Sequence, residues 1–151
     1  MKCKLAFTSD SCQLAEVRRA ARAFLTKCGF DECTGELLVL AVDEACTNII
    51  RHAYAHECKP VRLEMERLRD RVRFVLRDYG RSCSPDRIRS RALEDVRPGG
   101  VGVHIIRQAF DYVNYEPRPR GTKLVLEKKL PQVPDSQGSS AGKSAPAMHK
   151  E

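Results

Sequence analysis

One stretch of the sequence, Leu37 to Tyr54, combines a helical apolar stripe with two polar side chains at its edge. At the helical spacing of about 100° per residue, small and aliphatic residues form a single stripe: Leu37, Leu38, Ala41, Val42, Ala45, Cys46 and Ile49. Glu44 and Asn48 are four residues apart on one edge of that stripe, so they lie one above the other. A carboxylate and a carboxamide in this position predict that a helix from about Gly35 to His56 faces a pocket.

The length and apolar content of the chain indicate a single globular domain. A chain of 151 residues, with 42% hydrophobic and 31% charged residues, can bury one sizeable core. There is no long apolar run, so no transmembrane span is expected, and Met1 to Phe7 is too short and polar for a signal peptide. The segment 131–151 is rich in Pro, Ser, Gly and Ala and is predicted to be disordered. These features predict a cytoplasmic protein with one domain, 1–130, and a tail.

The formal net charge of +7 leaves two interpretations open. The charge could attract nucleic acid, or it could form a solvated basic surface that meets an acidic partner or a nucleotide. The Lys and Arg residues are scattered without interleaved aromatic residues and without a recognition-helix signature, which favours the second interpretation. The seven cysteines form no Cys-x-x-Cys pair and no Cys/His cluster with zinc spacing. Free thiols, several of them on core faces, are therefore expected.

Hydrophobic periodicity divides the chain into short strands and amphipathic helices. Alternation predicts strands in these segments: 2–7, 61–66, 72–77, 111–116 and 122–130. Three- and four-residue spacing predicts a helix that ends at Cys28 before Gly29, and another from about Val103 to Phe110. The first of these helices either covers a sheet or offers a surface to a partner or a second copy. Residues 81–98 are predicted to form a mobile excursion that could act as a lid, with a short helix near Ile88 to Leu93.

Asp78 stands out because of its place in the strand alternation. Val72, Phe74 and Leu76 predict the core-facing side of one strand, and Asp78 continues the same even-numbered set just before Gly80. A carboxylate aimed at the apolar side is costly without a partner. Asp78 therefore either caps a turn at the strand end or accepts a hydrogen bond from a ligand, and the sequence leaves both open.

A glycine-rich segment, Gly99-Gly100-Val101-Gly102, runs directly into a predicted helix. Glycine lets the backbone approach a ligand closely, and the amino end of a helix attracts anions. The same glycines would also suit a flexible connection, so the segment on its own allows either function.

Four segments with these properties occur in order along the chain. They are Glu-x-x-x-Asn on a helix (VDEACTNIIRHAY), Asp-x-Gly after a strand (DYGR), Gly-Gly-x-Gly before a helix (GGVGVHIIRQAFDYVNYE), and Gly-Thr opening a strand (GTKLVLEKKL). Together they resemble the GHKL ATPase superfamily, the Bergerat-fold group that includes histidine kinases. Within it they resemble the anti-sigma factor serine kinase family (RsbW/SpoIIAB-like), from Met1 to about Leu130. The resemblance implies an α+β fold, a two-layer sandwich whose mixed, mostly antiparallel sheet is covered by helices on one face.

The resemblance also implies a role for individual residues. Asn48 is similar to the family's Mg²⁺ ligand, and Glu44 is similar to the general base that orients or deprotonates the attacking hydroxyl. Asp78 is similar to the residue that accepts the adenine amino group. Gly80 would permit the turn under the base, and Thr122 would support Asp78.

The backbone around the phosphates is expected to come from one run: Gly100, Val101, Gly102, Val103 and His104. His104 stands where an apolar residue is commoner in the family, and it either touches phosphate or lies on the helix surface. The Asp-x-Gly segment continues with Arg81 and lacks a further glycine found in many GHKL members, as the serine kinases often do. The sequence contains no phosphoacceptor-histidine helix, which argues against a complete sensor histidine kinase.

The family implies an ATP- and Mg²⁺-dependent protein serine/threonine kinase that is also an anti-sigma factor. Members hold a sigma factor away from RNA polymerase, switch partner to a small STAS-type anti-anti-sigma factor, and phosphorylate a serine of that antagonist. They often form homodimers, for which the first helix here could serve. Two other functions stay open: a non-catalytic ATP-binding module of a signalling cassette, and a nucleic-acid binder. The expected partners do not include nucleic acid or membrane.

Overall fold

The computed structural model describes residues 1–8, 11–53, 59–80 and 101–133. In chain order its elements are β1 (Lys2–Thr8), α1 (Ser11–Lys27), α2 (Glu32–Asn48), η1 (Ile49–Ala53), β2 (Pro60–Arg67), β3 (Arg71–Arg77), α4 (Val101–Ala109), β4 (Tyr112–Pro117) and β5 (Thr122–Lys129). Each strand and helix predicted within the described ranges is present, with shifted ends. The predicted excursion at 81–98, its short helix, and residues 134–151 of the predicted disordered tail, 131–151, lie outside the described residues.

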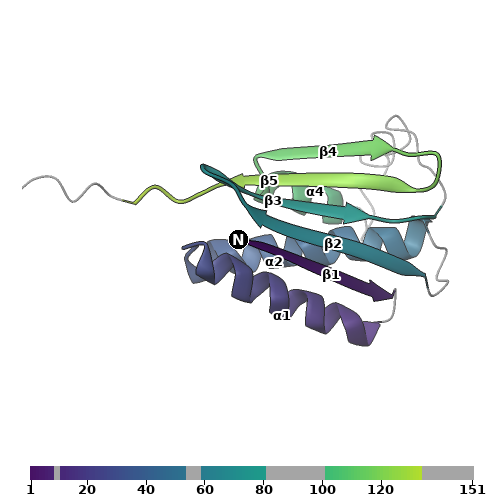
Figure 1. Ribbon diagram of the computed structural model, residues 1–151, viewed down its shortest axis with the longest axis horizontal. Helices are drawn as coiled ribbons and strands as arrows, with labels where there is room; N and C mark the ends of the chain where they lie inside the picture. Colours follow the sequence, from purple (N-terminus) through teal and green to yellow (C-terminus); the bar gives the residue numbers. More distant parts are fainter. Residues whose placement is uncertain (9–10, 54–58, 81–100, 134–151) are drawn as a thin grey trace, which may run out of the picture.

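The strands form one sheet, and the helices cover one of its two faces (Figure 1). The strand order is β1-β2-β3-β5-β4, and every pair of neighbours in the described sheet is antiparallel. The predicted α+β fold with one covered face is therefore confirmed. The described sheet is wholly antiparallel rather than mixed as predicted. The pairs β2–β3 and β4–β5 are hairpins, and a tight turn can join only antiparallel strands, while β1–β2 and β3–β5 also pair in the antiparallel direction.

The core lies between the covered face of the sheet and the helices. Val72, Phe74 and Leu76 are fully buried, as their alternation predicts. The ring of Phe74 meets the rings of Phe24 in α1 and Phe110 after α4 edge-on, with centroid distances of 5.7 Å and 5.6 Å. Edge-to-face contacts of this kind contribute about 0.5–1.5 kcal/mol each beyond their buried area. They fix α1 and the end of α4 against the middle of the sheet.

Helix α2 begins earlier than its sequence pattern predicts. Asp31 is the N-cap, and its Oδ1 accepts a hydrogen bond from the Thr34 N–H at 2.6 Å. Residues 32–35 form the first helical turn, although the helix was predicted to begin only at about Gly35, and Gly35 is buried within this turn. A side-chain cap satisfies an otherwise orphaned backbone donor, so the helix can start directly after Asp31.

The buried stripe of α2 differs from the predicted one at its margins. Leu37 is 42% exposed, so its predicted place in the stripe is wrong, whereas Val39 is buried. The buried arc is centred on Leu38, Val42 and Ala45, and Leu37 lies about 100° from Leu38 on the outward side. The other predicted stripe residues are buried.

The α-helical geometry of α2 ends at Asn48. Residues Ile49–Ala53 form the π-helical turn η1, and the Ile49 N–H donates to the carbonyl oxygens of both Ala45 and Cys46. The predicted continuation as a regular helix is therefore wrong from Ile49 onward, and residues 54–56 lie outside the described residues. π-Helical turns are frequent at functional sites, and this one follows Asn48 directly.

Two cysteines illustrate the predicted thiols on core faces. Cys28 and Cys46 are buried, and burial raises the pKa of both thiols. Neither is an exposed, activated nucleophile. In the part of the chain that the structure describes, no helix has the length and apolar character needed to cross a bilayer.

Candidate functional site

Glu44 and Asn48 lie on the last turns of α2, and both are half-buried. They are one helical turn apart at the border of the buried stripe, which is where their spacing predicted them. Their polar groups therefore face the region beside the core rather than open solvent.

The turn of α2 that carries Glu44 is also tied to α1 through its neighbour Asp43. The Arg18 guanidinium donates to Asp43 Oδ1 at 2.7 Å, and this pair is partly buried. The Thr47 hydroxyl donates to the Asp43 carbonyl oxygen at 2.9 Å. The Arg18–Asp43 pair therefore ties this turn of α2 to α1, whereas the Thr47 contact lies within α2.

Gly102, in the first turn of α4, lies directly against the Glu44 carboxylate. A Cβ added at Gly102 would lie 2.5 Å from Glu44 Oε2 and 3.3 Å from its carboxyl carbon. Only glycine leaves this room, so the Glu44 carboxylate closely approaches the backbone of the first turn of α4. The structure thus brings together the Glu-x-x-x-Asn segment and the Gly-Gly-x-Gly segment, which are far apart in the sequence.

Asp78 follows β3 on the helix-covered side of the sheet and is only 3% exposed. The predicted inward direction of its side chain is confirmed. The Gly80 N–H donates to Asp78 Oδ1 at 3.1 Å, and the Asp78 N–H donates to the Thr122 carbonyl oxygen, also at 3.1 Å. Thr122 is buried beside it at the start of β5. The Asp-x-Gly segment and the Gly-Thr segment therefore also meet.

The electrostatic state of Asp78 reflects its burial. Burial raises the pKa of its carboxyl group, while the N–H groups of Gly80 and Thr122 and the charge of Arg77 act in the opposite direction. A buried carboxylate gains stability from each further donor, so Asp78 is suited to accept a hydrogen bond from a ligand.

Two residues beside Asp78 were not singled out as site residues from the sequence. Gly121 has φ +75°, and a Cβ added to it would lie 2.1 Å from the Asp78 carbonyl oxygen and 2.7 Å from Oδ1. The Arg77 guanidinium donates to the Asp78 carbonyl oxygen and, at 3.4 Å, to that of Thr122. The Gly-Thr pair was a sequence signal for Gly121. No signal pointed to Arg77, because its alternation places it on the opposite face of the sheet.

The remaining predicted site residues lie on or just before α4. Val101 is its first residue, Val103 is half-buried, and His104 is exposed at the helix surface. Gly100 lies outside the described residues. The predicted phosphate-binding run is therefore placed at a helix amino end, where backbone N–H groups lack partners within the helix.

The site residues suit a nucleotide with its metal ion. Among the described residues, no group of three or more His, Cys, Asp or Glu side chains could hold a metal ion. A single carboxamide such as Asn48 fits Mg²⁺, which takes most of its ligands from phosphate and water when it is bound with a nucleotide. The space at the Gly102 Cβ position is taken by the Glu44 carboxylate, so this end of α4 can offer phosphate its backbone N–H groups.

We expect Asp78→Asn to stabilise the ligand-free protein at neutral pH. Because the folded-state pKa of Asp78 is raised, the folded protein binds a proton here more tightly than the unfolded chain does. Below the ordinary carboxyl pKa, Asp78 is protonated in both the folded and the unfolded protein, so no charge is buried. Above the raised pKa it is charged in both, and the full cost of burying the charge applies. The advantage of the variant should therefore grow as pH rises through that window, measured as urea midpoints over an acidic pH series.

Asp70→Asn is the matched control for this pH dependence. Asp70 is exposed, and its hydrogen bond with Arg71 lowers its pKa, so removing its charge should slightly destabilise the protein above the ordinary carboxyl pKa. If Asp78→Asn shows the same sign as Asp70→Asn, the carboxyl of Asp78 is not destabilised by burial.

The chain is similar to a known family of ATPase domains and to proteins named as protein kinases. The family model described as histidine kinase-like ATPase domain matches residues 7–128, a range that includes both groups of site residues. Serine-protein kinase RsbW of Halalkalibacterium halodurans is 29% identical over 76% of this chain and 74% of that protein. Serine/threonine-protein kinase BtrW of Bordetella bronchiseptica is 30% identical over 59% of this chain and 66% of that protein.

A solved structure has the same fold. It is the histidine kinase domain from Erythrobacter litoralis EL346 blue-light activated histidine kinase, with a TM-score of 0.52 and 20% sequence identity. The likeness covers 78% of this chain and 60% of that chain. At this identity it bears on the fold alone.

Proposed function

The chain belongs to the histidine kinase-like ATPase domain family, and we propose on that premise that it is an ATP-dependent protein serine/threonine kinase. The observation that carries the proposal is the contact between Glu44 and Gly102, which places a carboxylate against the start of a helix. A carboxylate is not needed to bind phosphate and would repel it, so its presence beside an anion-binding helix end favours a role in proton transfer.

The adenine end of the site is built around Asp78. Its carboxylate accepts the adenine amino group, which supplies the donor that a buried carboxylate needs. Gly80 and Thr122 hold the carboxyl in place through their backbone groups. Gly121 permits the β4–β5 turn to approach the Asp78 backbone.

The phosphate end of the site lies at the start of α4. Backbone N–H groups of the run from Gly100 to His104 would bind the phosphates, which the positive end of the helix dipole would attract. Asn48 offers its side-chain oxygen to a Mg²⁺ ion, which would neutralise charge on the phosphates.

Glu44 acts as the general base in the transfer. It accepts the proton of the substrate hydroxyl as that oxygen forms a bond to the γ-phosphorus. The bond from the γ-phosphorus to the β–γ bridging oxygen breaks, and ADP leaves. The Arg18–Asp43 pair keeps this turn of α2 in position.

We propose further that the protein is a cytoplasmic anti-sigma factor that regulates transcription by partner switching. It would bind a sigma factor, and it would phosphorylate a serine of a STAS-type anti-anti-sigma factor. Phosphorylation adds negative charge at the docking surface and so releases the antagonist. The relatives named serine-protein kinase RsbW support this proposal, together with the ordered motifs of the family.

We expect the purified chain, given γ-labelled ATP, Mg²⁺ and the STAS-type protein encoded nearest to its gene, to transfer label to one serine of that protein. The acceptor serine changed to alanine is the control. ATP binding without transfer would favour a non-catalytic ATP-binding module instead. Absence of ATP binding would contradict both functions.

A further inference from the structure

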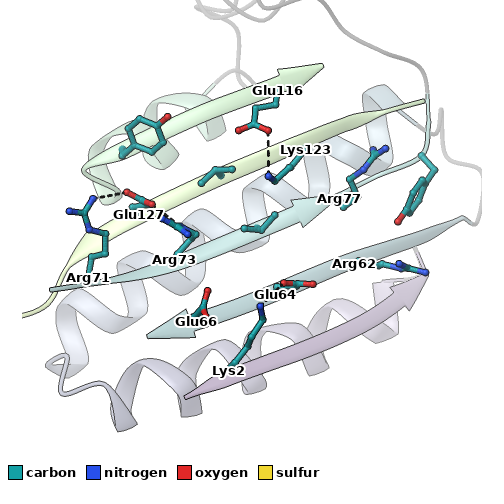
Figure 2. A pocket seen from close by; sticks show the side chains of 14 residues that line it. Lys2, Arg62, Glu64, Glu66, Arg71, Arg73, Arg77, Glu116, Lys123 and Glu127 are labelled. Carbon is teal, nitrogen blue, oxygen red and sulfur yellow. Dashed lines mark hydrogen bonds and ion pairs between the residues drawn. The ribbon is translucent and has the colours of Figure 1, made fainter. Parts of the chain in front are cut away.

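The open face of the sheet, on the side away from the helices, carries mostly charged side chains. They surround a hollow of about 720 Å³ that lies on the opposite side of the sheet from the helices (Figure 2). The strand register sorts these side chains into rows that cross the sheet. Two of the rows differ in charge balance, and the difference indicates what the face can bind.

One row is balanced. Lys2, Glu66, Arg73 and Glu127 are successive cross-strand neighbours on β1, β2, β3 and β5, so their charges alternate in sign. Glu127 is further held by Arg71 at 3.0 Å and by Arg73 at 2.7 Å. Opposite charges facing each other across strands stabilise a sheet, so this end of the face needs no ligand.

A second row contains three cations in succession, and we call it the cation row. Arg62 on β2 is opposite Arg77 on β3, and Arg77 is opposite Lys123 on β5. Figure 2 shows the three side chains on neighbouring strands, with Lys123 alone joined to a carboxylate, that of Glu116. Like charges directly opposite each other destabilise a sheet.

The local surroundings neutralise the cation row only in part. Lys123 shares Glu116 with Arg118, at 3.5 Å and 2.8 Å. Among the described residues, neither Arg62 nor Arg77 forms an ion pair, and both guanidinium groups instead lie over the ring of Tyr79, at 5.8 Å and 4.6 Å from its centroid. An aromatic face attracts cations but carries no net negative charge. The charge of Arg62 is therefore left for an external anion, and that of Arg77 is only partly used by its contacts with the Asp78 and Thr122 carbonyl oxygens.

We propose that the cation row is a docking surface for an acidic helix of a protein partner. Neighbouring strands are about 4.8 Å apart, so the backbone positions that carry the three cations are spaced at about that interval. Residues one turn apart on a helix are about 5–6 Å apart, which matches this interval closely. Alternate residues of an extended strand are about 6.6–6.8 Å apart and would drift out of register over three cations.

The row beside the cations supports a protein partner. Val75 and Val125 are cross-strand neighbours there, and they provide an apolar floor for side chains next to the carboxylates of the docked helix. The acidic Glu64 and Glu66 limit the basic area to one end of the face. A nucleic-acid backbone needs a longer basic track, and a second copy of this face would place cations against cations.

The test uses alanine-based helical peptides and the full-length protein without nucleotide. The probe is a fluorescein-labelled peptide with glutamates at positions i, i+4 and i+7, and its control has glutamine at those positions. Fluorescence anisotropy at low ionic strength should show that the wild type binds only the glutamate peptide. The double variant Arg62→Gln/Lys123→Gln should bind it at least about tenfold more weakly, because charge-assisted contacts are lost.

Lys4→Gln is the matched control, because Lys4 lies on the same face and pairs with Glu64 outside the cation row. It should leave the affinity within about twofold, since an exposed, paired charge contributes little. Arg77 is left unchanged because it also contacts the Asp78 and Thr122 backbone. These measurements use no ATP, so their failure and that of the kinase proposal can be told apart.

Several outcomes would overturn the proposal. Lys4→Gln removes one charge and the double variant two, so a loss of binding free energy in Lys4→Gln of about half that of the double variant would show that net charge alone is sensed. Equal binding of the glutamine peptide would exclude carboxylate recognition. Tighter binding of a single-stranded oligonucleotide or of anionic vesicles, lost in the double variant, would identify a different occupant. A wild-type dimer by light scattering that the double variant converts to a monomer would identify a second copy on this surface.

Discussion

Gly121→Ala should destabilise the protein by about 3 kcal/mol or more and abolish nucleotide binding. The φ angle of Gly121 is +75°, a conformation that L side chains rarely adopt. An added Cβ would also lie 2.1 Å from the Asp78 carbonyl oxygen and 2.6 Å from its carbonyl carbon. These are backbone atoms, so they cannot rotate away as a side chain could. Either the turn or the end of β3 must move.

Gly29→Ala is the control that separates the cost of a positive φ angle from the cost of the steric clash with the Asp78 backbone. Gly29 also has a positive φ, +90°, but nothing lies within 4 Å of a Cβ added there. Its substitution should therefore cost only the backbone strain, on the order of 1 kcal/mol. Urea unfolding of both variants gives the two free-energy losses, and their difference measures the close approach of Gly121 to Asp78.

The affinity for nucleotide should distinguish Gly121→Ala from Gly29→Ala more strongly than their stabilities do. Displacing the Asp78 backbone moves the carboxylate that is proposed to accept the adenine amino group, so Gly121→Ala should show no measurable binding by calorimetry. Gly29 lies between α1 and α2, far along the chain from the adenine end, and its variant should bind as the wild type does. Equal stability losses and unchanged affinity in both variants would contradict a close Gly121–Asp78 contact.

The local features of this fold were predictable because single side chains determine them. The alternation at Val72, Phe74 and Leu76 was enough to predict the burial of Asp78, since a strand has a period of two. The four-residue spacing of Glu44 and Asn48 was enough to place both on one edge of α2. Helix ends were less predictable, because the N-cap of Asp31 and the π-helical turn after Asn48 depend on local backbone geometry.

The features that depend on pairing between distant segments could not be predicted. The strand order β1-β2-β3-β5-β4 places Arg77 between Arg62 and Lys123, and each of these cations looks unremarkable in its own strand. Strand alternation likewise could not predict that Arg77, whose side chain lines the open face, contacts the Asp78 carbonyl oxygen. The register of a sheet, and the tertiary contacts that follow from it, are not written in any single stretch of sequence.

Glu44→Ala should leave ATP binding measurable and reduce phosphate transfer by at least about 100-fold, the contribution expected of a positioned general base. The carboxylate lies beside the start of α4 but is not needed to hold adenine or phosphate, so its loss should lower the rate of transfer rather than the affinity for ATP. Single-turnover transfer of labelled phosphate to the STAS-type protein measures the rate, and calorimetry measures the affinity.

Two further variants show whether the position of this carboxylate matters. Glu36→Ala removes the same charge from an exposed site on the same helix, where the partner is Arg22, and should leave transfer unchanged. Gly102→Ala keeps Glu44 but places a Cβ 2.5 Å from its Oε2, so the carboxylate must move. Alanine favours a helix by up to about 1 kcal/mol over glycine, so this variant should stay folded while transfer falls. If Glu44→Ala transfers phosphate at the wild-type rate, Glu44 is not the base. If only Gly102→Ala is impaired, the first turn of α4 acts on the phosphates without the help of Glu44.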